Sequence, residues 1–270
     1  MLKKILRLLG AVLLLIVVAI GGLYLKYYSI VSTDSNTLQT KYTPGKLGRF
    51  VDPFIGTGGY YYNCINNFPG SNVPFSMVRL SPDTKSWFKG YVALNSSGYY
   101  YPDDMIIGFS HNRLSGTGAT DGGNFRVMPV AGDVDEDDLR NGIAEKFSHE
   151  NERAFPGYYA VKLNNGILAE LTTTTRTGVH RYTFPPGNEK HILLYVSSIL
   201  GDRSEYPSKE ASVKIDEKTG VITGSVRSFG TFGRRYGGTK VYFSARFNKP
   251  FKRYSIYDGK TFKKEMPFLA

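Results

Sequence analysis

The N-terminal region contains a run of eighteen residues without a charge, and this run constrains the chain more than any other feature. Lys3, Lys4 and Arg7 precede the run, which extends from Leu8 to Leu25. About 18 or more apolar residues are long enough to cross a bilayer as a helix, whereas the apolar part of a cleavable signal has about 7 to 15. The sequence therefore predicts a membrane anchor at residues 1–26, with a cleaved signal segment as the alternative.

The basic residues before the run are expected to stay in the cytoplasm. The rest of the chain, which follows the run, is then expected to be exported across the membrane. Residues 27–46 are polar and lack both helical and strand periodicity, so we expect a tether there. The folded body is expected at residues 47–270. The predicted location is the periplasm or the cell surface, with the body anchored to the membrane or secreted.

The body is rich in strand and turn residues. The whole chain of 270 residues contains 30 glycines, 20 tyrosines and 17 phenylalanines, and short alternating segments in the body are separated by turn residues. The candidate strands are 76–82, 105–111, 125–132, 158–164, 168–184, 191–199, the two arms of a hairpin at 212–228, and 240–247. An acidic run at 133–138 indicates a short helical or irregular piece. The pattern predicts an all-β fold, an antiparallel β-sandwich.

Charge and cysteine content exclude several classes of protein. The net charge is +11, but the basic residues are dispersed and no reading motif accompanies them, so we expect no nucleic-acid partner. Cys64 is the one cysteine, so no disulfide can form within the chain. The four histidines show no i, i+4 pair and no Cys-x-x-Cys is present, so no zinc site is predicted.

The glycine-rich stretch GFSHNRLSGTGATDGGNF, Gly108 to Phe125, does not match three common motifs. Its spacing, G-x-G-x-x-x-G, is one residue wider than the dinucleotide fingerprint. A phosphate-binding P-loop ends in Gly-Lys-Ser/Thr, where this stretch has Asp-Gly-Gly. A nucleophile elbow needs a final glycine where Asn112 stands, so a serine hydrolase is not indicated.

The same stretch carries many groups that can bind hydroxyls. Each sugar hydroxyl needs donor and acceptor partners, so this mixture on a permissive backbone suits a polyhydroxylated ligand. A purely structural loop tip is the alternative. The candidate substrate-binding residues here are Ser110, His111, Asn112, Arg113, Thr117, Gly118 and Asp121.

Four blocks of the body are long, ordered and specific. They are VDPFIGTGG (51–59), NNFPGSNVPFSMVRLSPDT (66–84), GYYYPDDMIIGFSHNRLSGTGATDGGNFRVMP (98–129) and PGYYAVKLNNGILAELTTTTRTGVHRYTFP (156–185). Through them the chain resembles the N-terminal domain of glycoside hydrolase family 92, the calcium-dependent exo-α-mannosidases. The resemblance implies a β-sandwich of the galactose-mutarotase-like, or supersandwich, type. It also implies a larger (α/α)6 barrel packed on the sandwich, a mannoside pocket between the two, and inversion at the anomeric carbon.

In that family the catalytic glutamate and aspartate and the calcium ligands belong to the barrel. The resemblance therefore implies that this chain holds no catalytic residue and no metal ligand, and that its partners are an α-mannoside glycan, the barrel domain and the membrane. It further implies that the glycine-rich loop lines the pocket and that the sandwich is truncated before its last strands. Trp87 is a candidate sugar platform, because an aromatic face can pack on a pyranose ring; core packing is the alternative.

The sequence thus predicts the N-terminal, pocket-contributing part of an exported α-mannosidase, incomplete for catalysis by itself. Two alternatives stay open. One is a membrane-tethered, lectin-like carbohydrate-binding module without catalysis, and the other is a fragment of a gene.

Overall fold

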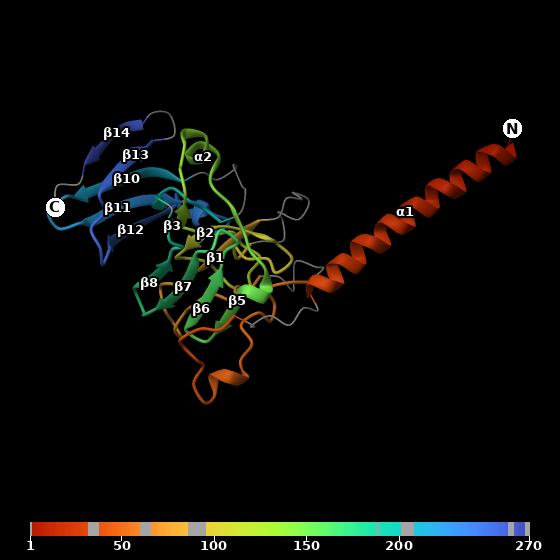
Figure 1. The fold of residues 1–270 in the computed structure, drawn as a ribbon, viewed down its shortest axis with the longest axis horizontal. Coiled ribbons are helices and arrows are strands. Elements are labelled where there is room, and N and C mark those ends of the chain that lie inside the picture. Colours follow the sequence, from red (N-terminus) through yellow and green to blue (C-terminus); the bar gives the residue numbers. More distant parts are fainter. Residues whose placement is uncertain are drawn as a thin grey trace.

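A computed structural model describes residues 2–31, 38–59, 66–85, 96–187, 189–200, 208–258 and 262–267. It begins with the long helix α1 (Leu2–Val31), which extends away from a body of β-strands (Figure 1). Within α1, Lys3–Leu25 is long and apolar enough to cross a membrane. The helix continues past the predicted end at residue 26, because residues 27–31 contain no glycine or proline to stop it.

Two antiparallel sheets form the centre of the body (Figure 1). The first has the order β1-β2-β3-β9, with the short strand β4 pairing with β2. Its strands are β1 (Ser81–Lys85), β2 (Met105–Ser110), β3 (Arg126–Ala131), β4 (Glu145–Lys146) and β9 (Lys190–Tyr195). The second has the order β5-β6-β7-β8. Its strands are β5 (Glu152–Phe155), β6 (Tyr158–Lys162), β7 (Leu168–Thr173) and β8 (Gly178–Thr183).

The core lies between these two sheets. Leu80, Phe109 and Met128 come from the region of the first sheet, Tyr159 and Leu171 come from the second, and all five are at most 1% exposed. Burying a large apolar side chain contributes about 1.5–3 kcal/mol. The shared core therefore holds the two sheets together as a sandwich.

The later part of the chain adds two smaller antiparallel sheets. Their strands are β10 (Lys209–Asp216), β11 (Val221–Ser228) and β12 (Thr239–Arg246) in one, and β13 (Arg253–Tyr257) and β14 (Phe262–Pro267) in the other. The described residues also form short helices: α2 (Glu136–Asn141) and the 3-10 turns η1 (Gly48–Phe50), η3 (His149–Asn151) and η4 (Gly233–Tyr236). Asp135 caps α2 by accepting from the amide of Asp138 at 2.8 Å, and the Asp138 carboxylate accepts from the amide of Asp135 at 3.2 Å.

The all-β, antiparallel prediction is confirmed, since every strand pair among the described residues is antiparallel. The hairpin predicted at 212–228 is also present, as β10 and β11. The strand predicted at 76–82 begins only at Ser81. The backbone before it bonds three separate segments instead of one partner strand: the amide of Met77 donates to Thr175, that of Arg79 to His111 and that of Leu80 to Ser71.

The segment predicted as one strand at 168–184 is two strands, β7 and β8. A turn separates them, in which the amide of Thr174 donates to the carbonyl of Thr177 at 2.9 Å. The amide of Thr177 in turn donates to the Thr174 hydroxyl at 3.2 Å. A threonine hydroxyl that bonds the backbone in this way favours a turn over a continuous strand.

Candidate functional site

The glycine-rich stretch connects β2 to β3 and is closed at its base. Arg113 and Gly122 form an isolated antiparallel bridge, and the amide of His111 donates to the carbonyl of Asn124 at 3.2 Å. Gly122 has a φ of 97°, and a side-chain carbon there would lie 2.2 Å from the carbonyl oxygen of Asn112. Only glycine fits such a position. The glycine therefore allows the two sides of the loop to meet.

The side chain of Arg113 is buried and donates hydrogen bonds to the backbone around it. Its side chain is 0% exposed, and Nη2 lies 3.0 Å from Oδ1 of Asp83. The same nitrogen donates to the hydroxyl of Ser110 at 2.8 Å. The guanidinium also donates to five backbone carbonyls, those of Arg79, Ser81, Pro82, Ser97 and Ser110. Arg113 therefore fixes the start of the loop to β1.

Ser110 belongs to the same buried cluster. It is 0% exposed, and its hydroxyl donates to Oδ1 of Asp83 at 2.9 Å. Burial raises the pKa of Asp83 above its usual value, and the positive charge of Arg113 opposes that rise. The side chains of Ser110 and Arg113 thus have their partners inside the protein, and a direct contact of either with a ligand stays a prediction.

His111 follows the last residue of β2 and faces His180 on β8. The two Nε2 atoms are 3.0 Å apart, and Nδ1 of His111 lies 2.9 Å from the carbonyl oxygen of Phe125. Nδ1 of His180 lies 2.7 Å from the hydroxyl of Tyr182. Burial lowers the pKa of His111 to about 4 and lowers that of His180 well below its usual value. Both rings are therefore neutral near pH 7.

Asp121 joins the loop to the part of the chain before β12. Its Oδ1 accepts from the amide of Gly233 at 2.8 Å, and its Oδ2 accepts from the amide of Phe232 at 3.0 Å. These amides lie at the start of η4, where unpaired backbone donors need an acceptor. Asp121 therefore caps η4 in this structure.

The other candidate residues are more open. Thr117 and Gly118 are exposed and Asn112 is half-buried. The hydroxyl of Thr117 accepts from the amide of Ala119 at 3.2 Å. Trp87 lies outside the described residues, so its role as a sugar platform stays a prediction. Of the predicted set, Asn112, Thr117 and Gly118 are the described members best placed to meet a ligand.

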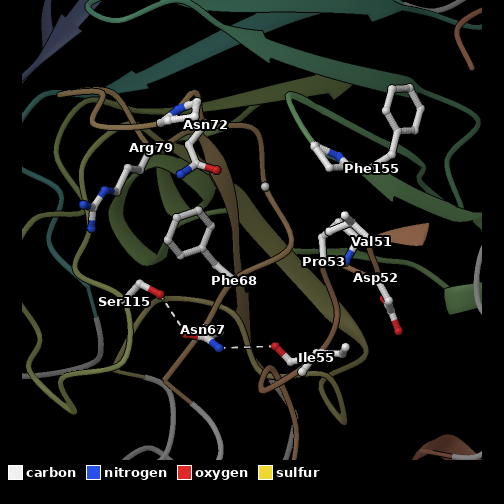
Figure 2. A pocket seen from close by; sticks show the side chains of 13 residues that line it. Val51, Asp52, Pro53, Ile55, Asn67, Phe68, Asn72, Arg79, Ser115 and Phe155 are labelled. Atoms are coloured by element: carbon white, nitrogen blue, oxygen red, sulfur yellow. Dashed lines mark hydrogen bonds between the residues drawn. The ribbon is translucent and has the colours of Figure 1, made fainter. Parts of the chain in front are cut away.

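A pocket of about 540 Å³ lies beside the loop (Figure 2). Its walls come from segments far apart in the sequence. The lining residues are Val51, Asp52, Pro53, Ile55, Asn67, Phe68, Gly70, Asn72, Pro74, Arg79, Ser115, Phe155 and Pro156. Sequence reasoning did not identify these residues as a site. A signal was present, because most of them lie in the blocks 51–59 and 66–84 that carry the family resemblance.

Hydrogen bonds attach the glycine-rich loop to this pocket. The hydroxyl of Ser115 donates to Oδ1 of Asn67 at 2.7 Å, and Nδ2 of Asn67 donates to the carbonyl of Ile55 at 3.3 Å (Figure 2). The amide of Gly116 donates to the carbonyl of Asn66 at 2.7 Å. The loop tip therefore forms part of the pocket wall.

The lining of the pocket is mostly apolar with a few polar groups. Phe68 and Phe155 provide aromatic surface, while Arg79 and Asn72 provide donors. Such a combination is typical of small-molecule and sugar sites, where apolar surface excludes water and a few polar groups fix the orientation. Asp52 is the one carboxylate among the lining residues described.

Large apolar side chains are exposed within or next to the segments that line the pocket. Phe50, Ile55 and Met77 are between 66% and 74% exposed. Phe75 follows the lining residue Pro74 and is fully exposed, at a φ of 60°. Where such side chains lie together, an exposed apolar patch marks an interaction site more often than an inert surface.

Among the residues that the structure describes, no three His, Cys, Asp or Glu side chains lie close enough together to hold a metal ion.

Comparison with known proteins identifies the family. Residues 50–267 match the model of the glycosyl hydrolase family 92 N-terminal domain. The chain belongs to glycoside hydrolase family 92. The predicted family and its N-terminal domain are confirmed.

The chain is similar to longer proteins of known sequence or structure. It is 30% identical over 204 residues to an uncharacterized secreted glycosidase of Arthroderma benhamiae, covering 72% of this chain and 24% of that protein. It is 32% identical to a family 92 α-mannosidase of Bacteroides thetaiotaomicron, with a TM-score of 0.64 over 80% of this chain and 28% of that one. The same enzyme in complex with mannoimidazole matches at 31% identity and a TM-score of 0.64, over 80% of this chain and 27% of that chain. This family 92 chain thus spans about a quarter of the length of these relatives.

Proposed function

We propose that this chain is the N-terminal part of an exported α-mannosidase that acts on α-mannosides of glycans. Family membership carries the proposal, since residues 50–267 match the family domain and a solved relative at 32% identity is an α-mannosidase. The pocket beside the glycine-rich loop supports it, because it combines aromatic faces with hydrogen-bond donors.

In this proposal the chain binds and orients the sugar but does not cleave it. Phe68 and Phe155 pack on the sugar ring, and Asn72 and Arg79 donate to its hydroxyls. Asn112 and the exposed loop residues Thr117 and Gly118 contact a second part of the glycan. Arg113 and Ser110 hold the loop that presents these groups.

An inverting glycosidase needs two carboxyl groups about 6.5–9.5 Å apart, one as general acid and one as general base for a water. Asp52 is the one carboxylate residue that lines the described pocket, and we place the catalytic pair on the barrel domain, as the family resemblance implies. We place the calcium ligands there too, as the family resemblance implies.

We further propose that the barrel domain packs on the apolar surface around the pocket. Phe50, Ile55, Phe75 and Met77 leave that surface exposed here, and covering each would contribute about 1.5–3 kcal/mol. A sugar bound between the two domains would then be shielded from water by both of them.

The chain alone is expected to show no turnover, because binding without an acid and a base does not lower the barrier to glycosidic cleavage. The measurement is hydrolysis of an activated aryl α-mannoside by residues 1–270 in detergent, with and without calcium. Turnover that a substitution within this chain abolishes would contradict the proposal.

A fusion tests the positive side of the proposal. Residues 1–270 joined to the remaining region of the solved Bacteroides thetaiotaomicron relative should hydrolyse the same mannoside. In that fusion Asn72→Ala should lower kcat/KM by about tenfold or more, equivalent to about 1.4 kcal/mol. Lys162→Ala is the matched control, since Lys162 is exposed on β6 and does not line the pocket. Equal activity of the Asn72 variant and the unchanged fusion would argue against this pocket.

We propose that α1 stays attached as an anchor with the body outside the cytoplasm. The segment Lys3–Leu25 has 23 residues, which at about 1.5 Å each is enough to cross a hydrocarbon core of about 30 Å. The intact mass of the mature protein should include residues 3–25, and the protein should remain with membranes after alkaline washing. A new N-terminus between residues 19 and 35 would show that the protein is secreted instead.

A further inference from the structure

The contact between His111 and His180 has a defined direction, which follows from the chemistry of its two ends. A carbonyl oxygen can only accept, so Nδ1 of His111, 2.9 Å from the carbonyl of Phe125, carries the proton. A neutral imidazole carries one N–H, which leaves Nε2 of His111 as an acceptor. Nε2 of His180, 3.0 Å away, must therefore be the donor.

The same reasoning extends to Tyr182. With its proton on Nε2, His180 has an accepting Nδ1, and the Tyr182 hydroxyl at 2.7 Å donates to it. Burial raises the pKa of Tyr182 well above its usual value, so the hydroxyl keeps its proton. Each group in the series thus has one possible role.

The series connects two sheets at the base of the glycine-rich loop. His180 and Tyr182 lie on β8, whereas His111 follows the last residue of β2 and Phe125 precedes β3. The backbone of His111 also bonds the other side of the loop base, through its amide to the carbonyl of Asn124 at 3.2 Å. Its carbonyl accepts from the amide of Arg79, in the segment before β1, at 2.7 Å. Moving His111 would therefore move the loop.

We infer that His111, His180 and Tyr182 form a latch that holds the glycine-rich loop closed on β8 and releases it when the two histidines take up protons. The inference rests on the proposed function only for the claim that this loop borders a sugar pocket. The latch itself is a property of the described atoms.

Protonation opposes the closed arrangement in two steps. A first proton on Nε2 of His111 requires the His111–His180 and His180–Tyr182 hydrogen bonds to reverse their direction. It also places a positive charge near the guanidinium of Arg113, whose own charge adds to burial in lowering the pKa of His111. A second proton places two N–H groups against each other at 3.0 Å. Among the described neighbours, Tyr182 from β8 and Leu80 from the segment before β1 are neutral and offer no compensating charge.

The pH dependence has a definite sign. In the closed protein the pKa of both histidines is lower than the usual value of 6.5, and that of His111 is about 4. The open loop therefore binds more protons, and closure is fully favoured above about pH 6.5 and weakens as the pH falls toward 4. Each histidine that gains a proton on opening increases the open population about tenfold per pH unit, so the pair increases it up to about a hundredfold.

Hydrogen exchange of the full chain in detergent micelles tests the latch. After correction for intrinsic rates, amides of residues 111–125 should exchange up to about a hundredfold faster for each pH unit lost between pH 6 and 4.5. The β10–β11 hairpin, which contains no histidine, is the internal control and should not show this slope. His180→Gln keeps a donor to His111 but cannot titrate. In this variant the exchange rate of the loop amides should therefore rise only about tenfold for each pH unit lost. His191→Gln on β9 should behave as the unchanged protein.

Nitrogen NMR of histidine-labelled chain near pH 7 provides a second measurement that needs no variant. It should show the proton on Nδ1 of His111 and on Nε2 of His180. The opposite tautomers, or equal slopes for the loop and the hairpin, would overturn the inference. A fusion that fails to hydrolyse mannosides while the latch behaves as described would contradict the proposed function alone.

Discussion

Arg113→Ala is expected to lower the free energy of unfolding by about 3–5 kcal/mol, because it leaves the buried charge of Asp83 without its partner. The two side chains are 0% and 5% exposed and only 3.0 Å apart. The substitution also removes the donor to the Ser81 and Ser97 carbonyls, each 2.8 Å from the guanidinium. A typical domain has only about 5–15 kcal/mol of stability. Urea unfolding of the full chain in detergent, followed by circular dichroism, measures the loss.

Arg140→Ala is the matched control. Arg140 pairs with Glu136 at 3.1 Å, but both side chains are more than half exposed. Exposed pairs of this kind contribute about 0–1 kcal/mol. Arg113→Lys should resemble the alanine variant, because an ammonium cannot reproduce the planar set of donors of a guanidinium. A loss at Arg113 no larger than at Arg140 would mean that the buried cluster does not support the fold.

The strands were largely predictable from the sequence because their signals are local. In the hairpin at 212–228, β-branched residues alternate with polar ones and Gly220, at a φ of 67°, provides the turn. The same rules failed at 76–80. There the backbone bonds three separate segments, and no pattern within the segment reveals partners that lie 9 to 98 residues away.

The role of Arg113 was not predictable for a related reason. An arginine beside a glycine-rich turn favours an exposed ligand-binding interpretation, since arginine is almost never fully buried unless it is paired. Its partners are Asp83 and backbone carbonyls from residues 79 to 110. Only the folded chain brings these acceptors together. The glycine-rich stretch was correctly identified as a loop, whereas the contacts by which Ser110, Arg113 and Asp121 maintain its shape were not predicted. The contact of these side chains with a ligand stays a prediction.

The pocket is a second example of the same limit. Its walls come from residues 51–55, 67–79, 115 and 155–156, and no single segment contains enough of it to suggest a site. The link from Ser115 to Asn67, 48 positions apart, is a hydrogen bond of 2.7 Å. The resemblance blocks contained all of these residues except Phe155, but their convergence is a property of the sandwich.

The second large effect is expected at Glu152, which is 0% exposed in the core region. Its carboxylate accepts from the hydroxyl of Tyr159 at 2.5 Å and from that of Tyr99 at 3.0 Å, and lies 2.7 Å from Nδ1 of His149. Burial, and then Glu152 itself, raises the pKa of both tyrosines well above the usual value, so both remain donors. Glu152 thus joins β5 to β6, to η3 and to the segment before β2.

Glu152→Leu is expected to lower the free energy of unfolding by about 3–5 kcal/mol, since each buried donor left without an acceptor costs about 1–3 kcal/mol. Adding Tyr99→Phe and Tyr159→Phe should restore part of that loss, because removing both partners of a buried hydrogen bond is nearly neutral. Urea unfolding of the single, double and triple variants isolates this coupling. Phenylalanine substitutions that add further loss instead of restoring stability would show that the side chain of Glu152 supports the core by its volume and not by its hydrogen bonds.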